Sequence, residues 1–338
     1  MKNCNLRTAI AAAVAMLVLI LDGRTALAGA SEGISICLNT LIPSLFPFIL
    51  LSILLAGSLS GQSLPILYSV AKYCRIPKGT ESLLAIGFLS GYPVGAQNVA
   101  LLHRTGQLSD QQAARMITIC NNAGPAFIFG ILGSMFSSRA VPWLLWTIHI
   151  ISALLVGVVL PGDRDQRVVS ALPRRIGLTE ALAQSVRTMA LICGWVLLMR
   201  MTISFLQRWF LWMLPVPVQA ILTGTLELAN GCLQLESIAC EGLRLIVASA
   251  FLALGGICVM LQTASVTEGI SMALYFPGKL LQCTFSILLA CGAQHLLPAL
   301  QHCSCGIIFS ISAAISAGLL LNLRKFKNNS GIPEILGV

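Results

Sequence analysis

The fold is decided by a stretch that reads Gly87-Phe-Leu-Ser-Gly-Tyr-Pro-Val-Gly-Ala-Gln-Asn98. It places three glycines, a proline and the polar side chains of Ser90, Gln97 and Asn98 inside an otherwise apolar region. A single lipid-facing helix is a poor reading, because the bilayer core offers no partners for the backbone groups that such a stretch frees. The pattern predicts a helix–break–helix hairpin that enters and leaves the membrane on one side.

A second interruption, Asn121-Asn-Ala-Gly-Pro125, lies near the middle of the apolar segment 110–138. Pro125 suits the first position of a new half-helix. A plain proline kink is the alternative, but two amides near the bilayer centre are costly unless they have partners. We therefore expect a broken helix with polar groups at mid-membrane.

The composition of the whole chain agrees with a membrane location. Hydrophobic residues make up 57% of the 338 residues and charged residues 10%, whereas a soluble domain carries about 25% charged residues. This excludes a soluble enzyme, a disordered chain and a nucleic-acid binder. It predicts an all-α polytopic protein of the cell membrane, with the lipid bilayer as its partner. The net charge of +9 is assigned to loops on the cytoplasmic side.

No motif for catalysis or for a cofactor is present. The sequence contains no P-loop, HExxH, GxSxG or triad spacing, so we expect no enzyme, no catalytic residues and no cofactor. The segment His302-Cys-Ser-Cys305 has metal-ligand residue types. It lacks a second cysteine pair, so no metal site is predicted.

Features of the first half recur in the second half. Glu32 and Thr40 return as Glu180 and Thr188, both at an offset of 148 residues. The stretch Gly224–Gly231 falls where the hairpin should recur, and Gly255–Gln262 falls where the break should recur. This order predicts two inverted repeats with re-entrant hairpins and broken helices.

The domain organisation follows from this repeat. We expect an N-terminal span at 1–30, a first repeat at 31–162, an Arg-rich cytoplasmic linker at 163–179, a second repeat at 180–325 and a cytoplasmic tail at 326–338. The N-terminal span also resembles a secretory signal with Ala26-Leu-Ala28 as its cleavage site, and cleavage is left open. Eight spans are predicted, at 8–28, 33–59, 110–138, 141–160, 181–213, 243–270, 277–297 and 304–323. Fifteen of the 21 Lys and Arg then fall on the cytoplasmic side.

Three strings carry a family resemblance: Leu41-Ile-Pro-Ser-Leu-Phe-Pro-Phe48, Leu89-Ser-Gly-Tyr-Pro-Val-Gly-Ala96 and Cys120-Asn-Asn-Ala-Gly-Pro-Ala-Phe-Ile-Phe-Gly130. They resemble the sporulation integral membrane protein YlbJ family, which carries the nucleoside-recognition (Gate) domain. Tyr92 departs from the small polar residue expected there. The resemblance implies Gate-type repeats, endospore formation, and transport of a small, dipicolinate-like organic anion across a membrane that surrounds the forespore.

The expected substrate site lies where the breaks of the two repeats converge. The predicted substrate-binding residues are Ser90, Gly91, Gly95, Gln97, Asn98, Asn121, Asn122, Gly124, Glu227, Gly256 and Gln262. Glu227 is expected to bind a proton or Na⁺, the alternative being a hairpin mouth in water. Arg187 and Arg200 are candidate anion partners; alternatively, Arg187 pairs with Glu180 and Arg200 snorkels.

Two other functions stay open at this point. One is a nucleoside or divalent-metal permease of the Gate type, and the other is a non-transporting assembly factor for sporulation. A homo-oligomer is compatible with each of them, and no nucleic-acid partner is expected.

Overall fold

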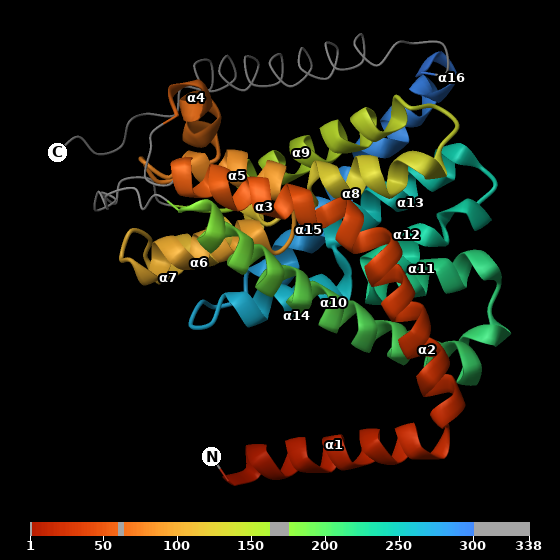
Figure 1. Ribbon diagram of the computed structural model, residues 1–338. Coiled ribbons are helices and arrows are strands. Elements are labelled where there is room, and N and C mark those ends of the chain that lie inside the picture. The colour runs from red at the N-terminus through yellow and green to blue at the C-terminus, as the bar shows by residue number, and fades with distance from the viewer. Residues whose placement is uncertain (1, 60–63, 163–175, 301–338) are drawn as a thin grey trace.

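The computed structural model describes residues 2–59, 64–162 and 176–300, and every regular element in these ranges is a helix (Figure 1). The helices are α1 (Lys2–Leu21), α2 (Gly23–Ile36), α3 (Ile42–Leu59), α4 (Pro65–Tyr73), α5 (Ser82–Ser90), α6 (Val94–Arg104), α7 (Asp110–Cys120), α8 (Pro125–Gly130), α9 (Val141–Val159), α10 (Leu178–Trp209), α11 (Val216–Leu226), α12 (Leu228–Leu233), α13 (Glu241–Leu254), α14 (Gly256–Val266), α15 (Tyr275–Ala293) and α16 (Leu297–Leu300). A π-helical turn, Cys37–Leu41, joins α2 to α3.

Five helical stretches within the described ranges are long and apolar enough to cross a membrane. They are Gly23–Leu59, Val141–Val159, Leu178–Trp209, Glu241–Val266 and Tyr275–Leu296. Their outer faces carry exposed leucine, valine and isoleucine side chains, for example Leu51, Val186 and Leu288, as expected of surfaces that face lipid. The predicted all-α polytopic membrane protein is confirmed.

The first long helix begins earlier than predicted. The predicted spans 8–28 and 33–59 place a break near residue 30, but the chain breaks at Asp22, whose carboxylate caps α2 by accepting from Thr25 N at 3.4 Å. Small residues near the predicted break serve helix packing. A Cβ on Gly29 would lie 3.0 Å from Met201 Cα of α10, so glycine lets α2 and α10 approach closely. Helix α1 lies apart from the bundle (Figure 1).

The predicted span 110–138 is broken, as expected. Helix α7 ends at Cys120, α8 covers only Pro125–Gly130, and a 3₁₀ turn follows at Leu132–Met135.

Four predicted features lie outside the described residues. They are the span 304–323, the His302–Cys305 cluster, the tail and the linker residues 163–175.

Two helical hairpins enter the bundle from opposite ends. Helices α5 and α6 form the first, and α11 and α12 form the second. Figure 1 shows the α6–α7 turn at one end of the bundle and the α10–α11 turn at the other, with both hairpin tips pointing toward the middle. The inverted repeats and their boundaries stay a prediction.

Within the described ranges, two of the fifteen basic residues counted on the cytoplasmic side are buried inside the protein. Arg115 is 4% exposed, and its Nη2 donates to the carbonyls of Cys74 and Gly157, each at 2.6 Å. The side chain therefore joins the end of α4 to α9 by satisfying free carbonyl groups. Lys279 on α15 is fully buried. Both residues lie within predicted spans, 110–138 and 277–297, and tertiary contacts hold their side chains inside the protein.

Candidate functional site

The first repeat packs its hairpin tip against its broken helix. The tip is Gly91-Tyr92-Pro93, between α5 and α6, and the break is Asn121–Gly124, between α7 and α8. A Cβ on Gly124 would lie 2.8 Å from Gly91 N, closer than two such atoms can approach. Glycine is therefore required where the two interruptions meet.

The second repeat has the same construction. Glu227 interrupts the hairpin between α11 and α12, and Gly255 interrupts the helix pair α13–α14 with a φ of 74°. Gly256 also has a positive φ, and a Cβ on it would lie 3.1 Å from Gly224 O. In both repeats, then, glycine backbone of the broken helix packs on glycine backbone of the hairpin.

Hydrogen bonds connect the two repeats across the middle. Tyr92 donates through its hydroxyl to Leu252 O at 2.8 Å. Asn121 donates through Nδ2 to Thr263 Oγ1 at 2.8 Å and to the Tyr275 hydroxyl at 2.9 Å. The Tyr92 hydroxyl and the Asn121 amide NH₂ thus find partners on α13, α14 and α15, whereas Asn121 Oδ1 is buried without a hydrogen-bond partner among the described residues.

A small central cavity lies where the hairpins and broken helices converge. Its volume is about 50 Å³, and five of the predicted site residues line it: Ser90, Gly91, Gly124, Glu227 and Gln262. Apolar side chains of α3 and α10, including Ile49, Ile192 and Val196, complete the wall. The cavity has room for a few water molecules and is smaller than the 300–1,000 Å³ of ordinary small-molecule sites.

Glu227 brings a carboxylate to this cavity. It is 3% exposed, so it does not stand in bulk water at a hairpin mouth. Oε1 accepts from Ala229 N at 3.0 Å, and Oε2 accepts from Asn230 N at 2.7 Å and Asn230 Nδ2 at 2.6 Å. Three of the roughly four acceptor positions of a carboxylate are therefore filled by N–H donors.

The other predicted residues lie away from the cavity wall. Asn121 and Asn122 are fully buried behind it. Gly95 and Gly256 pack against backbone carbonyls, those of Cys120 and Gly224 respectively. Gln97 and Asn98 lie one helical turn from the hairpin tip, in a separate cleft, where Gln97 Nε2 donates to Thr188 Oγ1 at 3.2 Å. They are not part of the central cavity because α6 carries them away from the tip.

A buried lysine, which the sequence analysis did not select, holds the first break. Lys279 Nζ donates to Asn121 O at 2.6 Å, to Gln282 Oε1 at 2.8 Å and to Asn122 Oδ1 at 3.3 Å. Lys279 and Gln282 are three residues apart in an apolar helix, so they share a face. A lone lysine in an apolar span is a functional candidate by default, and this signal was present in the sequence.

Two open cavities flank the central one. The Arg187 cleft measures about 400 Å³ and the Arg200 cavity about 280 Å³. The Arg187 cleft is lined by Gln97, Asn98, Arg104, Glu180, Gln184, Arg187, Thr188, Glu268 and neighbouring apolar residues. The Arg200 cavity is lined by Glu32, Ser35, Ile36, Arg200, Asn230, Leu233 and Gln234.

The same two helices line all three cavities in order. Along α10, Gln184 and Thr188 line the Arg187 cleft, Ile192 and Val196 line the central cavity, and Arg200 lines the third. The antiparallel α2–α3 helix does the same in reverse, from Ile53 to Ile49 to Glu32. At 1.5 Å per residue, the path from Gln184 to Arg200 is about 24 Å long, close to the hydrocarbon thickness of a bilayer.

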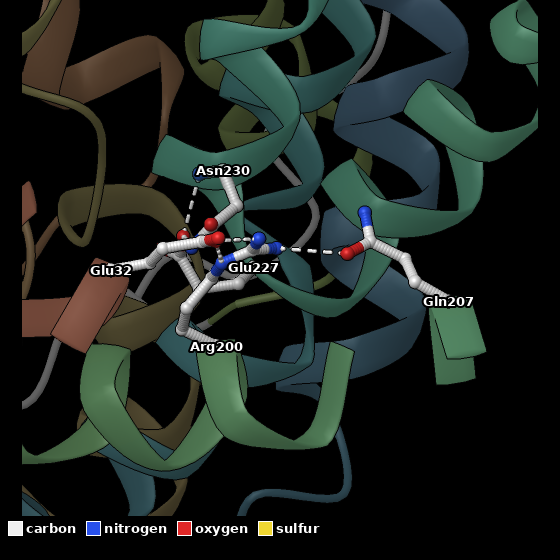
Figure 2. A network of polar contacts seen from close by, with 5 residues as sticks. All are labelled: Glu32, Arg200, Gln207, Glu227 and Asn230. Atoms are coloured by element: carbon white, nitrogen blue, oxygen red, sulfur yellow. Dashed lines mark hydrogen bonds and ion pairs between the residues drawn. The ribbon is translucent and has the colours of Figure 1, made fainter. Parts of the chain in front are cut away.

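An ion pair lies in the Arg200 cavity. Figure 2 shows the Glu32 and Arg200 side chains pointing toward one another, with Arg200 Nε 2.6 Å from Glu32 Oε2. Arg200 Nη1 also donates to Gln207 Oε1 at 3.4 Å. Asn230 lines the same cavity and donates to Glu227, so this residue connects the cavity to the buried carboxylate. Arg200 thus has a carboxylate partner, which the snorkelling alternative did not include.

Among residues 2–59, 64–162 and 176–300, no group of three or more His, Cys, Asp or Glu side chains is placed to hold a metal ion.

Comparison with known proteins adds one relative. The chain is 25% identical over 297 residues to the sporulation integral membrane protein YlbJ of Bacillus subtilis (strain 168), covering 74% of this chain and 73% of the relative. This similarity confirms the YlbJ-family resemblance. No family model matches the chain, and no solved structure matches it. Together with the five long apolar helices, the relative supports a multi-pass integral membrane protein.

Proposed function

We propose that this chain is a sporulation-associated permease that moves a small, dipicolinate-like organic anion across a membrane surrounding the forespore. The sporulation context comes from the name of the YlbJ relative. The observation that carries transport is the line of three cavities along α2–α3 and α10, with the two broken helices meeting at the central one. Discontinuous helices that meet at mid-membrane are the usual construction of a carrier site.

The central cavity is small in this conformation. At about 50 Å³ it is too small for an aromatic dicarboxylate, so substrate entry requires α3 and α10 to separate on one side at a time. Both flanking cavities carry guanidinium groups, Arg104 and Arg187 in one and Arg200 in the other. The Arg187 cleft also holds Glu180 and Glu268, and Glu32 pairs with Arg200. The guanidinium groups can therefore bind an anion that takes the place of these carboxylates.

Uptake by the purified full-length protein in proteoliposomes tests the proposal. We expect saturable uptake of labelled dipicolinate, abolished by Ile192→Trp, which fills the cavity, and preserved in Leu198→Trp, which lies on the exposed face of the same helix. Uptake of uridine or Fe²⁺ instead would favour the nucleoside or metal permease. No uptake of any of the three, with normal dipicolinate content and heat resistance in spores of a deletion strain, would contradict transport and favour the assembly factor.

A further inference from the structure

Lys279 is the most unusual buried group among the described residues. Its side chain is fully buried within α15, although a charged ammonium in a low-dielectric interior is costly unless it is paired. Its three hydrogen-bond acceptors within the described residues are neutral oxygens, from Asn121, Asn122 and Gln282. The rings of Tyr92 and Tyr275 lie 5.6 Å from Nζ and add cation–π attraction.

This coordination resembles a monovalent cation site rather than a salt bridge. Unwound backbone carbonyls and amide oxygens at a broken helix are the ligands with which carriers hold Na⁺. Here a main-chain carbonyl of the break, Asn121 O, and two amide oxygens converge on one point, and the ammonium occupies it.

The site lies directly behind the wall of the central cavity. Ala123 and Gly124, which line the cavity, follow the two asparagines that Lys279 holds, and Tyr92 contributes to the cavity wall. A positive charge behind this wall attracts an anion in the cavity through low-dielectric protein, where screening by water is weak.

We propose that Lys279 is a tethered cation that takes the place of a coupling metal ion at the first break and offsets the charge of an anion in the central cavity. The role of Lys279 in offsetting the charge of an anion rests on the proposed function. The role of Lys279 as the occupant of a cation site does not. It follows that transport requires no Na⁺, and that Lys279→Ala leaves a site for a free monovalent cation.

The cation site is tested without transport, by the unfolding midpoint of the purified protein in choline, sodium or n-propylammonium chloride. Propylammonium matches the atoms that Lys279→Ala removes. We expect propylammonium or Na⁺ to raise the midpoint of the variant by about 2 °C or more over choline, with no difference for wild type or for Lys72→Ala, an exposed lysine on α4. A variant that responds to neither cation would overturn the proposal.

The charge role is tested by uptake. We expect equal wild-type uptake in Na⁺ and choline, a loss of about tenfold or more in Lys279→Ala with choline, and partial recovery with propylammonium. If the alanine variant does not fold, Lys279→Gln replaces it; that change keeps a donor without the charge, so uptake must still fall. Normal uptake by either folded variant would overturn the charge role. If wild type transports no anion, the proposed function fails while the midpoint measurement still decides the cation site.

Discussion

The Tyr92 hydroxyl at the tip of the first hairpin donates a hydrogen bond to Leu252 O, 2.8 Å away and three residues before the Gly255 break. Tyr92 stands where the family pattern led us to expect a small polar residue. Its side chain therefore joins the hairpin of one repeat to the broken helix of the other. A rearrangement that moves the first hairpin tip relative to the Gly255 break must therefore disrupt this hydrogen bond or move Tyr92 and Leu252 together.

Removal of this bond should destabilise the junction of the repeats. We expect Tyr92→Phe to lower the free energy of unfolding by about 1–3 kcal/mol, because the buried Leu252 carbonyl loses its donor while the ring stays in place. Thermal unfolding of the purified protein in detergent measures the change. Tyr73→Phe, on α4 and away from the breaks, should change it by less than about 0.5 kcal/mol. Equal effects of the two substitutions would contradict the bridging role.

Close backbone packing makes Gly124 intolerant of any side chain. A Cβ on Gly124 would lie 2.8 Å from Gly91 N. Gly91 N is a backbone atom, so it cannot move aside as the end of a flexible side chain could. We expect Gly124→Ala to cost about 2 kcal/mol or more, whereas Gly292→Ala in α15, with nothing within 4 Å, should be neutral or stabilising. Size-exclusion profiles after heating compare the two, and a stable, monodisperse Gly124→Ala would show that the two breaks are not packed as described.

The interruptions were predictable because their causes are local. Gly91 and Pro93 at the hairpin tip, Pro125 after the first break and Gly255 at the second all disfavour continuous helix by their own backbone properties. The position of Asp22 as the true start of α2 was harder to predict. It depends on Gly29 and Gly33 packing against α10, a contact between segments about 170 residues apart in the sequence.

The content of the site was only partly predictable. Ser90, Gly124 and Glu227 belong to the interruptions themselves, and they reach the central cavity. Gln97 does not, because its direction depends on how α6 turns after Pro93. Lys279 was missed although a lone lysine in an apolar span is itself a signal. Its partners at the first break depend on α15 packing against α7, a contact that no local pattern encodes.

Glu227 should make uptake depend on pH. An anion in the central cavity lies beside this carboxylate, and two like charges in a buried site repel each other strongly. Protonation of Glu227 removes the repulsion, so we expect wild-type uptake to fall as pH rises. Glu227→Gln, which keeps an acceptor for Asn230, should flatten the profile. Glu236→Gln, an exposed residue of the same region, should keep the wild-type profile. Superimposable profiles for Glu227→Gln and wild type would remove the proton from the mechanism.

The Glu32–Arg200 pair should act on transport more than on stability. Glu32 is 55% exposed, and such pairs contribute about 1 kcal/mol or less to folding. We expect Glu32→Gln and Arg200→Gln to unfold within a few degrees of wild type while changing the rate of anion uptake, because each frees the mouth of the Arg200 cavity. The charge-swapped double variant Glu32→Arg/Arg200→Glu should recover the wild-type rate if the pair closes this mouth. A double variant no better than the single ones would contradict that role.

The predicted inverted arrangement of the repeats gives the last experiment. Lys72, Arg75 and Lys78 precede the first hairpin and resist translocation, whereas Glu236 and Glu241 follow the second and do not. The α6–α7 turn should therefore face the cytoplasm and the α10–α11 turn the opposite side, as their positions at opposite ends of the bundle require (Figure 1). Thr105 at the end of α6 and Pro217 at the start of α11 are exposed, so cysteines at these positions are accessible to a labelling reagent. Gln107, in the α6–α7 turn, is buried and is not suitable.

Single cysteines at these positions, in a background without the exposed Cys240, report the topology through an impermeant maleimide. In intact cells we expect Pro217→Cys to react, and Thr105→Cys to react only after the membrane is permeabilised. Permeabilisation also serves as the control for accessibility, because both cysteines must then label. Equal labelling of both in intact cells would place the two hairpin mouths on one side. The two halves could not then gate opposite faces of a shared central site, and alternating access through the three cavities would fail with them.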